Sequence, residues 1–427
     1  MPLDIFRVRK GTMIKAVRGF NDILPEETPR WRQVEEEARR VLEGFGFREI
    51  RVPVLERTEL FARGIGQSTD IVEKEMYTFS DKGGESVTLR PEATSSIVRA
   101  YIEHKLYAWD PEVRLYFIGP MFRYERPQKG RLRQFHQINA EVFGVAHPMV
   151  DAEVIGVLIH LLRSLGLQGY RLEINSLGCP RCRPPFRERL RSYLGEHLRE
   201  LCPDCRRRAE RNPLRVFDCK VEGCQEVILQ APLLEGFLCE ECRAHFGEVK
   251  NYLEDLGIPY EVNPRMVRGL DYYTRTAFEV VAEGLGAQNA VAAGGRYDDL
   301  VASLGGPSIP GIGFAVGMER LLLLLPPHPS LPRARLFIAA LGPEAQRIAF
   351  RWSFHLNREG ITTMLDYRGG SLKSQMRRAD KFSVPYVAIL GEEEIERGKV
   401  ILRDMREKTQ KELPFSSFIE AIKGELL

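Results

Sequence analysis

Apolar positions in the first part of the chain follow a helical period and then switch to alternation. Residues 31–45 place valine, alanine and leucine on one helix face, and the glycines that follow end the pattern. Strand-forming residues come next at 50–55, where Pro53 belongs at a sheet edge because proline donates no ladder hydrogen bond. A further stretch, 76–89, has paired glycines near its centre and predicts a hairpin, with a helix expected over 95–107.

A longer hairpin is predicted for residues 113–143. Strand-forming residues at 113–118 lead into a polar loop at 125–133, and alternation returns at 135–143. Polar side chains share the face of this second strand that carries its phenylalanines. An unpaired polar group costs free energy to bury, so this face predicts a ligand pocket. Its residues are Phe135, Gln137, Asn139, Glu141 and Phe143.

The remaining pattern predicts an insertion, the end of the first domain and a separate C-terminal domain. A helix at 151–165 and a strand at 170–175 precede a largely helical, proline-punctuated stretch that holds every cysteine. A strand at 277–281 and a glycine-spaced strand and helix at 311–325 come before a stiff proline-rich linker at 326–332. Strands then alternate with helices, which predicts a small, mainly parallel α/β domain. Its strands are expected at 336–341, 361–367 and 386–390, and its helices at 343–358 and 371–382.

Composition limits the class of protein. The 427 residues are enough for two or three domains, and 44% apolar and 28% charged residues are ordinary for a globular chain. No apolar run reaches the roughly 18 residues of a membrane span, and residues 1–12 carry no apolar signal core, so we expect a cytoplasmic protein. Residues 1–12 are interpreted as a leader, with Met13 as an alternative start. The net charge of +3 excludes a bulk polycation, and a basic excess beyond residue 333 is compatible with a nucleic-acid partner.

Arginine and lysine are concentrated in the loop of the long hairpin. Arginine suits bidentate phosphate contacts, so the loop is a candidate phosphate site. A surface hairpin with a solvated tip is the alternative, because charge runs usually face water. The polar face of the following strand favours the phosphate site. The basic residues are Arg123, Arg126, Lys129, Arg131 and Arg133.

The eight cysteines form four short pairs within one segment. Such spacing in a cytoplasmic-looking chain favours metal binding over disulfides. Eight thiolates suit two closed tetrahedral zinc sites of four cysteines each, which would be structural rather than catalytic. Reduced thiols and disulfides are the alternatives. The pairs are Cys179 and Cys182, Cys202 and Cys205, Cys219 and Cys224, and Cys239 and Cys242.

Four stretches resemble the histidyl-tRNA synthetase family of class II aminoacyl-tRNA synthetases. FRYERPQKGRLRQFHQ, at 122–137, is long and idiosyncratic and resembles motif 2. GFREIRVPVLE, at 46–56, resembles motif 1, which builds the dimer interface, and GIGFAVGMERL, at 311–321, resembles motif 3. RGLDYYTRTAFE, at 268–279, resembles the signature specific to the histidine enzymes. The resemblance covers nearly the whole chain from about Lys15.

This resemblance implies an ATP- and Mg²⁺-dependent histidine–tRNA ligase. Such an enzyme forms histidyl-adenylate and diphosphate, and then transfers histidine to the 3′ end of tRNA(His). Arg123 and Arg268 are implied as catalytic groups on opposite sides of the α-phosphate, where preorganised cations stabilise the pentavalent transition state. Arg320 would hold the far phosphates, and Phe135 and Arg320 would enclose the adenine. The implied ATP-binding residues are Arg123, Glu125, Arg131, Phe135 and Arg320.

The same resemblance implies how histidine is held. A site that hydrogen-bonds both imidazole nitrogens rejects analogues that leave its buried polar groups unpaired. Two of the implied residues lie at the start of the 95–107 helix, where capping is their alternative role. The implied imidazole-binding residues are Glu141, Tyr272 and Tyr273, and the residues implied for the α-amino group are Glu92, Thr94 and Gln137.

The fold implied is α+β. It has a catalytic domain with the antiparallel class II sheet, a mostly helical insertion and a C-terminal α/β anticodon-binding domain. The implied partners are tRNA(His), L-histidine and ATP, with a homodimer as the assembly and no membrane. A basic helix with Lys373, Arg377, Arg378 and Lys381 belongs to the resemblance, and a solvated face is its alternative. The expected domains are 13–177 and 263–325 for catalysis, 178–262 for the cysteine-rich insertion, 326–332 for the linker and 333–427 for anticodon binding.

Three other functions fit parts of the pattern. A regulatory paralogue of the histidine-biosynthetic phosphoribosyltransferase would lack the C-terminal domain and an intact motif 2 loop, whereas this chain has both. A prolyl or threonyl synthetase is disfavoured by Glu141 and by the 268–276 stretch. A degenerate RNA-binding or stress-sensing module is disfavoured because no implied catalytic position is altered.

Overall fold

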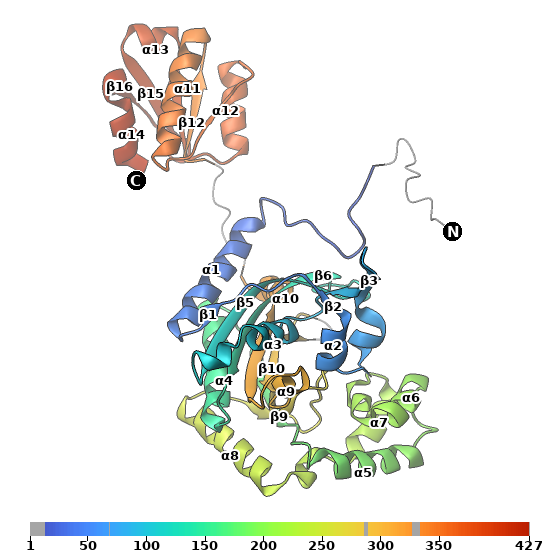
Figure 1. Ribbon diagram of the computed structural model, residues 1–427. Helices are drawn as coiled ribbons and strands as arrows, with labels where there is room; N and C mark the ends of the chain where they lie inside the picture. The colour runs from blue at the N-terminus through green and yellow to red at the C-terminus, as the bar shows by residue number, and fades with distance from the viewer. Residues whose placement is uncertain (1–12, 68, 286–288, 327–333, 427) are drawn as a thin grey trace. The chain divides into compact units, whose positions relative to one another are not determined.

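The computed structural model describes residues 13–67, 69–285, 289–326 and 334–426. Two compact units divide the chain, Met1–Pro327 and His328–Leu427. Both contain sheets flanked by helices (Figure 1). Among the described residues, no helix is both long and apolar enough to cross a membrane. The proposed leader and all of the expected linker after Pro326 lie outside the described residues.

The first unit is built on an eight-stranded sheet in the order β1-β5-β6-β11-β10-β9-β7-β8. The central strands pair antiparallel, and the parallel pairs are β1 with β5 and β7 with β8 at the two edges. This confirms the predicted antiparallel catalytic sheet. The strands are β1 (Arg48–Glu49), β5 (Val113–Phe122), β6 (Gln134–Phe143), β7 (Tyr170–Ser176), β8 (Glu261–Val262), β9 (Thr274–Ala282), β10 (Ala290–Arg296) and β11 (Gly311–Gly317).

Helices cover both faces of this sheet, and β6 contributes side chains to a separate apolar core on each face. Ile138, Ala140 and Val142 of β6 join the main apolar core, and Phe143 packs into a second core on the opposite face. The predicted alternation of this strand is therefore confirmed. The first core includes α1 (Thr28–Gly44), α4 (Pro148–Ser164), α8 (Glu240–Asp255) and α10 (Met318–Leu324), and the second includes α3 (Thr94–Glu103) and α9 (Leu300–Ser303).

A three-stranded sheet in the order β2-β4-β3 contains the predicted short hairpin. Its strands are β2 (Leu55–Arg57), β3 (Tyr77–Ser80) and β4 (Ser86–Leu89), and α2 (Thr58–Ile65) and the π-helix η1 (Ile71–Glu75) separate β2 from β3. The predicted helix over 95–107 was too long, because α3 ends at Glu103 and Lys105 has φ 50°. A short 3₁₀ turn, η2 (Leu106–Ala108), follows it.

The strand predicted at 50–55 was wrong. The sheet pairing of β1 stops at Glu49, and β2 begins only at Leu55. Between them, the buried Arg90 side chain donates from Nη1 to the carbonyl oxygens of Val52 at 2.6 Å and Pro53 at 3.0 Å. A side chain therefore satisfies backbone acceptors that a strand partner would otherwise bind, which a local sequence pattern does not show.

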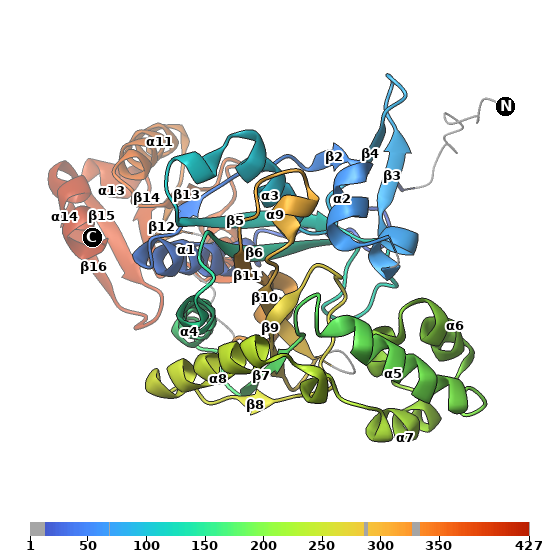
Figure 2. The same ribbon diagram turned by 60° about the horizontal axis from the view of Figure 1, so that its bottom comes forward.

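The cysteine-rich segment forms a helical body between β7 and α8. Phe186, Leu190 and Leu194 pack with Val227 and Ile228 and with the cysteines in a buried cluster of their own. Figure 2 shows α5, α6 and α7 grouped together, with α8 running back along the sheet. The elements are α5 (Arg183–Glu196), α6 (Pro203–Arg211), η3 (Pro213–Asp218), α7 (Glu222–Gln230) and η4 (Leu234–Phe237).

The second unit has a five-stranded sheet in the order β13-β12-β14-β15-β16. Its first three strands are parallel, as predicted, and β15 and β16 extend it antiparallel, which was not predicted. The strands are β12 (Leu336–Ala340), β13 (Thr363–Leu365), β14 (Tyr386–Leu390), β15 (Lys399–Asp404) and β16 (Gln410–Pro414). The helices are α11 (Pro343–Arg358), α12 (Leu372–Lys381), α13 (Glu392–Glu396) and α14 (Phe418–Leu426), with a 3₁₀ turn, η5 (Phe415–Ser417), before α14.

Candidate active site

Glu141 forms the floor of the site on β6, where only 1% of the residue is exposed. Its carboxyl group accepts hydrogen bonds from the Thr94 hydroxyl at 2.7 Å and the Tyr297 hydroxyl at 2.5 Å. Burial raises the pKa of Glu141 to about 8, and these two hydroxyls act in the opposite direction. Gly313 lies opposite on β11, where a Cβ would come 1.7 Å from Glu141 Oε2. The glycine therefore provides the space that the carboxyl group occupies.

Glu92 and Gln137 each have a buried oxygen atom without a hydrogen-bond partner among the described residues. Glu92 is 3% exposed, and its Oε1 accepts a hydrogen bond from the Ser95 backbone N–H at 2.9 Å. Glu92 thus caps α3, as one interpretation expected, yet its Oε2 has no hydrogen-bond partner among the described residues. Gln137 Oε1 is another buried acceptor without a partner in the described part of the chain. Because orphaned buried acceptors are costly, both atoms indicate a place for a hydrogen-bond donor of a ligand.

Two adjacent tyrosines border the same space. The Tyr272 and Tyr273 rings have centroids 4.7 Å apart, and the Tyr272 ring meets the Tyr297 ring edge-on at 5.7 Å. Burial raises the pKa of Tyr272 well above its usual value, and the Glu141 and Glu92 carboxylates act in the same direction. Tyr272 therefore lies within electrostatic range of both carboxyl groups, and Tyr273 lies within range of Glu141.

Arg268 approaches from the segment that precedes β9. Its guanidinium lies 5.1 Å from the Tyr273 ring centroid and forms an ion pair with Glu279. Its Nε is buried without a hydrogen-bond partner among the described residues. One N–H of this cation therefore has room for an acceptor from a ligand.

Arg123 lies at the base of the long hairpin loop. Its Nε donates to the Pro91 carbonyl at 2.8 Å, and its guanidinium lies 5.3 Å from the Phe135 ring centroid. Glu125 pairs with Arg131 at 2.8 Å and lies 3.9 Å from Arg123 Nη1. The loop therefore presents two guanidinium groups and one carboxylate at the same place.

Arg320, in the first turn of α10, joins this hairpin to the sheet. It donates to the carbonyl oxygens of Gly130 at 3.2 Å and Ala290 at 2.6 Å. Burial lowers the pKa of Arg320, and Arg131 and Arg123 lower it further. Several cations close enough to disfavour one another's charge form a site that favours an anion.

The predicted residues thus fall into connected groups. The first group, joined by hydrogen bonds and electrostatic contact, is Glu92, Thr94, Glu141, Tyr272 and Tyr273, and the second is Arg123, Glu125, Arg131, Phe135 and Arg320. Gln137 lies on β6, the strand that also carries Phe135 and Glu141. The Arg123 cation favours ionisation of Glu92, although burial is the larger effect and raises the Glu92 pKa. Arg268 is linked to the first group through Tyr273 and to the second through Glu279.

Sequence reasoning missed several residues that support the site. Tyr297 binds Glu141, and its neighbour Arg296 is fully buried against Asp151 at 2.5 Å. His245 of α8 also binds Asp151, at 2.9 Å. No local sequence pattern shows that two residues 145 positions apart, Asp151 and Arg296, form an ion pair.

The cysteines fall into two groups of four. In each group the four sulfur atoms lie within 4.8 Å of one another. The first and last pairs of the chain form one group, and the two middle pairs form the other. The groups are Cys179, Cys182, Cys239 and Cys242, and Cys202, Cys205, Cys219 and Cys224.

Comparison with known families matches both units. Residues 19–321 match the model of the family described as histidyl-tRNA synthetase, and residues 335–425 match that of an anticodon-binding domain. A histidine–tRNA ligase of Geobacter metallireducens is 58% identical over 401 residues, which cover 94% of this chain and 97% of the relative. The corresponding protein of Desulfosudis oleivorans is 57% identical over 405 residues, with 94% and 96% covered.

A solved structure shows the same architecture. The apo histidyl-tRNA synthetase of S. aureus is 39% identical and superimposes with a TM-score of 0.80. The match covers 96% of this chain and 100% of the S. aureus chain. The similarity therefore includes the insertion and both units.

Proposed function

The chain belongs to the histidyl-tRNA synthetase family, and on that premise we propose how its residues ligate histidine to tRNA. The enzyme activates L-histidine with ATP to histidyl-adenylate and diphosphate, and then transfers histidine to the 3′ end of tRNA(His). The observation that carries the residue roles is the buried carboxyl group of Glu141, which is in electrostatic contact with Glu92, whose Oε2 has no hydrogen-bond partner among the described residues.

We assign the imidazole ring of histidine to Glu141, Tyr272 and Tyr273. An ionised Glu141 would accept a ring N–H, while the Thr94 and Tyr297 hydroxyls hold the carboxylate in place. Rejection of other amino acids follows, because they would leave this buried group unpaired.

The α-amino group of histidine fits the other end of the pocket. An ammonium group donates three hydrogen bonds. Glu92 Oε2 and Gln137 Oε1 are acceptors without partners among the described residues. Thr94 connects the two carboxyl groups, because its hydroxyl donates to Glu141 and its backbone N–H favours the ionised form of Glu92. The amino group would thus remove the cost of the two orphaned acceptors.

In the first step, a carboxylate oxygen of histidine attacks the α-phosphorus of ATP. The new P–O bond forms as the bond to the bridging oxygen of diphosphate breaks, and the electron pair leaves with diphosphate. We assign Arg123 and Arg268 to the charge on the pentavalent phosphorus, where fixed cations lower the barrier. The Arg268 Nε, for which the described part of the chain offers no hydrogen-bond acceptor, supports this role.

We assign the rest of ATP to Glu125, Arg131, Phe135 and Arg320. Phe135 provides a ring face for adenine, and Arg320 provides the cation over it and toward the far phosphates. Mg²⁺ suits carboxylate and phosphate oxygens, and Glu125 and Glu279 are the carboxylates that lie in electrostatic range of Arg320. When bound, the ion would neutralise the phosphates and thereby favour departure of diphosphate.

The remaining parts of the chain fit transfer to tRNA. We propose domains at 13–177 and 263–325 for catalysis, 178–262 for the insertion, 326–332 for the linker and 333–427 for the anticodon. On α12, Lys373, Arg377 and Lys381 are exposed, whereas Arg378 pairs with Asp366 at 2.7 Å. The three exposed cations are therefore the candidate contacts to tRNA phosphates. A cytoplasmic location is proposed because translation consumes the product there.

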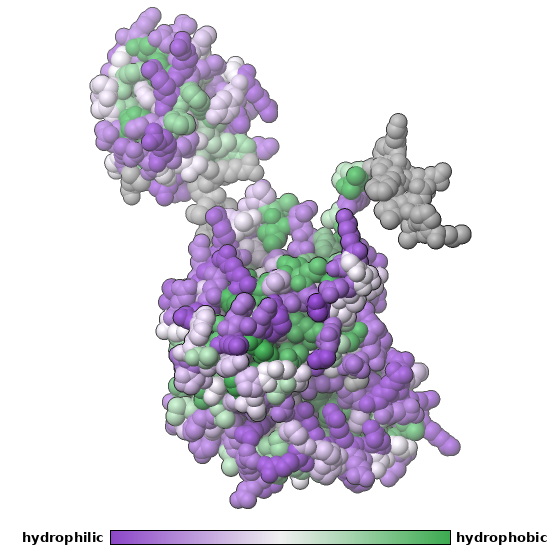
Figure 3. Space-filling view, in the orientation of Figure 1, coloured by the Kyte–Doolittle hydropathy of each residue, from purple (hydrophilic) through white to green (hydrophobic). Residues whose placement is uncertain are grey.

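We also propose a homodimer. A hollow of about 570 Å³ lies beside residues 46–56, the stretch that resembles motif 1 and is expected at the dimer interface. It is lined by Phe45, Arg48, Trp109 and Leu115 among others. Trp109 is 71% exposed, and apolar surface gathers in the middle of the larger unit in Figure 3. Exposed apolar surface of this kind is typical of an interface.

The test is ATP–diphosphate exchange with each of the twenty amino acids, followed by charging of tRNA(His). Histidine alone should support exchange, because only its side chain satisfies Glu141. Exchange with proline or threonine, or none with histidine, would refute the proposed function.

A further inference from the structure

Each four-cysteine group has the geometry of a single metal site. A tetrahedral zinc ion with Zn–S distances of about 2.3 Å places its sulfur ligands about 3.8 Å apart. In the outer group the Cys179 sulfur lies 3.6 Å from that of Cys182 and 3.9 Å from that of Cys239. In the inner group Cys202 and Cys219 have sulfur atoms 3.9 Å apart. A disulfide needs about 2.05 Å, and all eight cysteines are free.

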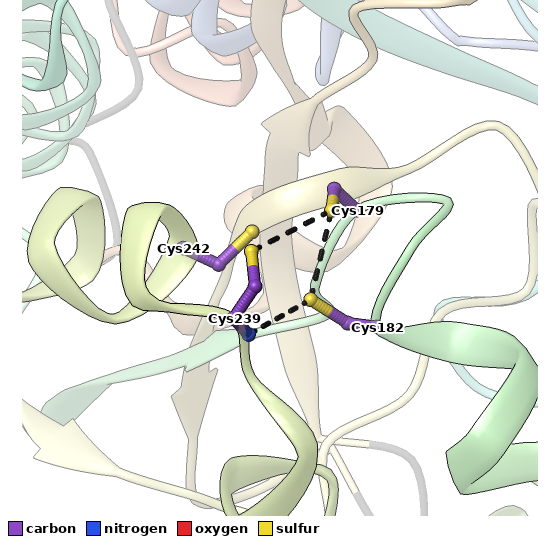
Figure 4. Close-up of side chains that lie close together, drawn as sticks. All are labelled: Cys179, Cys182, Cys239 and Cys242. Carbon is purple, nitrogen blue, oxygen red and sulfur yellow. Dashed lines mark hydrogen bonds between the residues drawn. The ribbon is translucent and has the colours of Figure 1, made fainter.

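The backbone around the sulfur atoms is also that of a thiolate site. The Cys239 N–H donates to Cys182 Sγ at 3.2 Å, and the Cys202 N–H donates to Cys224 Sγ at 3.2 Å. Figure 4 shows the outer thiols converging from two segments, one before α5 and one at the start of α8. Six of the eight cysteines are buried. Four sulfur ligands with no open position indicate a structural zinc site.

We propose that the insertion binds two zinc ions with nested pairing. The outer ion would be held by Cys179, Cys182, Cys239 and Cys242, and the inner ion by Cys202, Cys205, Cys219 and Cys224. The outer ion thus joins the segment before α5 to the start of α8, and the inner ion joins α6 and η3 to α7.

The outer site is connected to the segment that carries Tyr273. Arg183, next to Cys182, donates to the Tyr273 carbonyl oxygen. Gly178, next to Cys179, accepts from the Arg275 N–H at 2.9 Å. Glu241, between the last two cysteines, pairs with the Arg275 guanidinium at 2.5 Å.

Arg275 shows that this connection constrains the backbone. It has φ 49°, a left-handed conformation that side chains other than glycine adopt only when their surroundings impose it. Its backbone N–H and its guanidinium each bind one of the two cysteine knuckles of the outer site, and the guanidinium also lies 3.8 Å from Asp298 and 3.4 Å from His245. The outer zinc is therefore a positioning element for the tyrosines of the histidine pocket, a consequence that rests on the function proposed above.

The inner site reaches the same segment further upstream. Arg215 of η3 donates to the Arg268 carbonyl oxygen at 3.2 Å, and Asn212 donates to Asp271 at 3.4 Å. Both residues lie in the stretch between Cys205 and Cys219, which the inner ion would close into a loop. The two ions would therefore fix residues 268–275 from two sides.

Metal analysis of the full chain, purified without chelator, tests the assignment directly. We expect two zinc ions per chain. A mercurial reagent titrated into the wild-type protein should modify eight cysteine thiols and release both ions. Absence of zinc, iron in its place, or fewer than eight free thiols after denaturation with chelator would overturn the proposal.

Paired substitutions test the nesting. Cys182→Ser with Cys242→Ser should leave one zinc, because both residues belong to the outer site, and Cys182→Ser with Cys205→Ser should leave none. If sequential pairs shared a site, the two results would be reversed. If these variants fail to fold, the order of thiol modification and zinc release in the wild-type protein gives the same information.

The positioning role has a separate readout. Loss of the outer zinc in Cys182→Ser should raise the KM for histidine about tenfold or more, since small displacements of binding groups are costly, and should change the KM for ATP little. Cys182→His, which keeps a zinc ligand, should recover part of the affinity. An unchanged KM for histidine after loss of the ion would refute the positioning role. Absence of histidine-dependent exchange in the wild-type enzyme would instead refute the proposed function, and the metal content would stand.

Discussion

Glu141 shows how single residues prepare this site for its ligand. The carboxyl group is buried with hydroxyl donors, and burial raises its pKa to about 8. Glu92 and Gln137 add acceptors that have no partner within the described residues. Buried acceptors without donors cost free energy while the site is empty. An amino acid that donates hydrogen bonds from both its ring and its amino group would remove this cost. Alternation with phenylalanine in the sequence singled out Gln137 and Glu141, whereas Glu92 was indicated only by the family resemblance. Neither signal shows which hydroxyls hold Glu141.

The raised pKa of Glu141 predicts how stability depends on pH. A carboxyl group with a pKa of about 8 when folded and about 4.3 when unfolded binds more protons in the native state between these values. The free energy of unfolding should therefore fall as pH rises through this window, by up to about 1.4 kcal/mol per pH unit. Glu141→Gln cannot ionise and should lose this dependence.

Urea unfolding of both proteins without histidine at pH 6 and pH 8 measures this effect. The stability of Glu141→Gln relative to wild type should increase between the two values. Equal pH dependence of the two proteins would contradict the assigned protonation of Glu141.

The close approach of Gly313 to Glu141 predicts that no larger side chain is tolerated at position 313. A methyl group there would come 1.7 Å from Glu141 Oε2 and 2.4 Å from the Ala140 carbonyl oxygen. Gly313→Ala should reduce kcat/KM for histidine activation by about 100-fold, because the carboxyl group must move. Gly247→Ala on α8, where nothing lies within 4 Å, is the matched control and should stabilise the helix by about 0.5–1 kcal/mol without loss of activity. Exchange assays on both variants decide the matter, and near-normal activity of Gly313→Ala would be inconsistent with the pocket described.

Among the elements, a buried charge network joins α4, α8 and β10 beneath the site. Asp151 and Arg296 are both fully buried, and His245 binds the same carboxylate. Burial disfavours the ionised form of Asp151, yet His245 and Arg296 lower its pKa below the usual value. Local patterns predicted helices and strands such as α11 and β14 correctly, because each element carries its own period. They failed at 50–55, where the buried Arg90 side chain replaces a strand, and they did not show this network, because both depend on residues distant in sequence.

Removing one partner of the network should destabilise the catalytic unit. Asp151→Ala removes the main partner of the buried Arg296 charge and leaves it the Asp298 carboxylate at 3.0 Å, and breaking a buried pair costs about 3–5 kcal/mol. The measurement is the free energy of unfolding from denaturant titration. Glu36→Ala, at an exposed position on α1, is the control and should have little effect. Equal stability of the two variants would show that the network is not structural.

For the whole molecule, the proposed homodimer follows from exposed apolar surface in the first unit. Trp109 lines a hollow next to the edge strand β1 and its neighbour β5. Trp109→Glu places a charge in this interface and should convert dimers to monomers in sedimentation equilibrium. Leu229→Glu, at a position of the insertion that is 62% exposed, should leave the dimer intact. A wild-type protein that is monomeric at all concentrations would contradict this assembly.

Composition changes at two places along the chain, because the cysteines gather in one segment and a proline-rich stretch follows residue 325, and the proposed domain order stays a prediction. The antiparallel strands β15 and β16 could not be predicted, because the sequence beyond residue 390 has no strong period. The pairing of the cysteines also required the fold, because the spacing of the four pairs is nearly the same.

The central claim is that Arg268 acts on the same phosphorus as Arg123 while Glu141 holds the imidazole ring. Histidine-dependent ATP–diphosphate exchange by Arg268→Ala tests it most directly. Removal of a preorganised cation from the transition state should reduce kcat by about 100-fold or more, with folding unchanged by circular dichroism. A folded Arg268→Ala enzyme that exchanges at a near-normal rate would contradict the account.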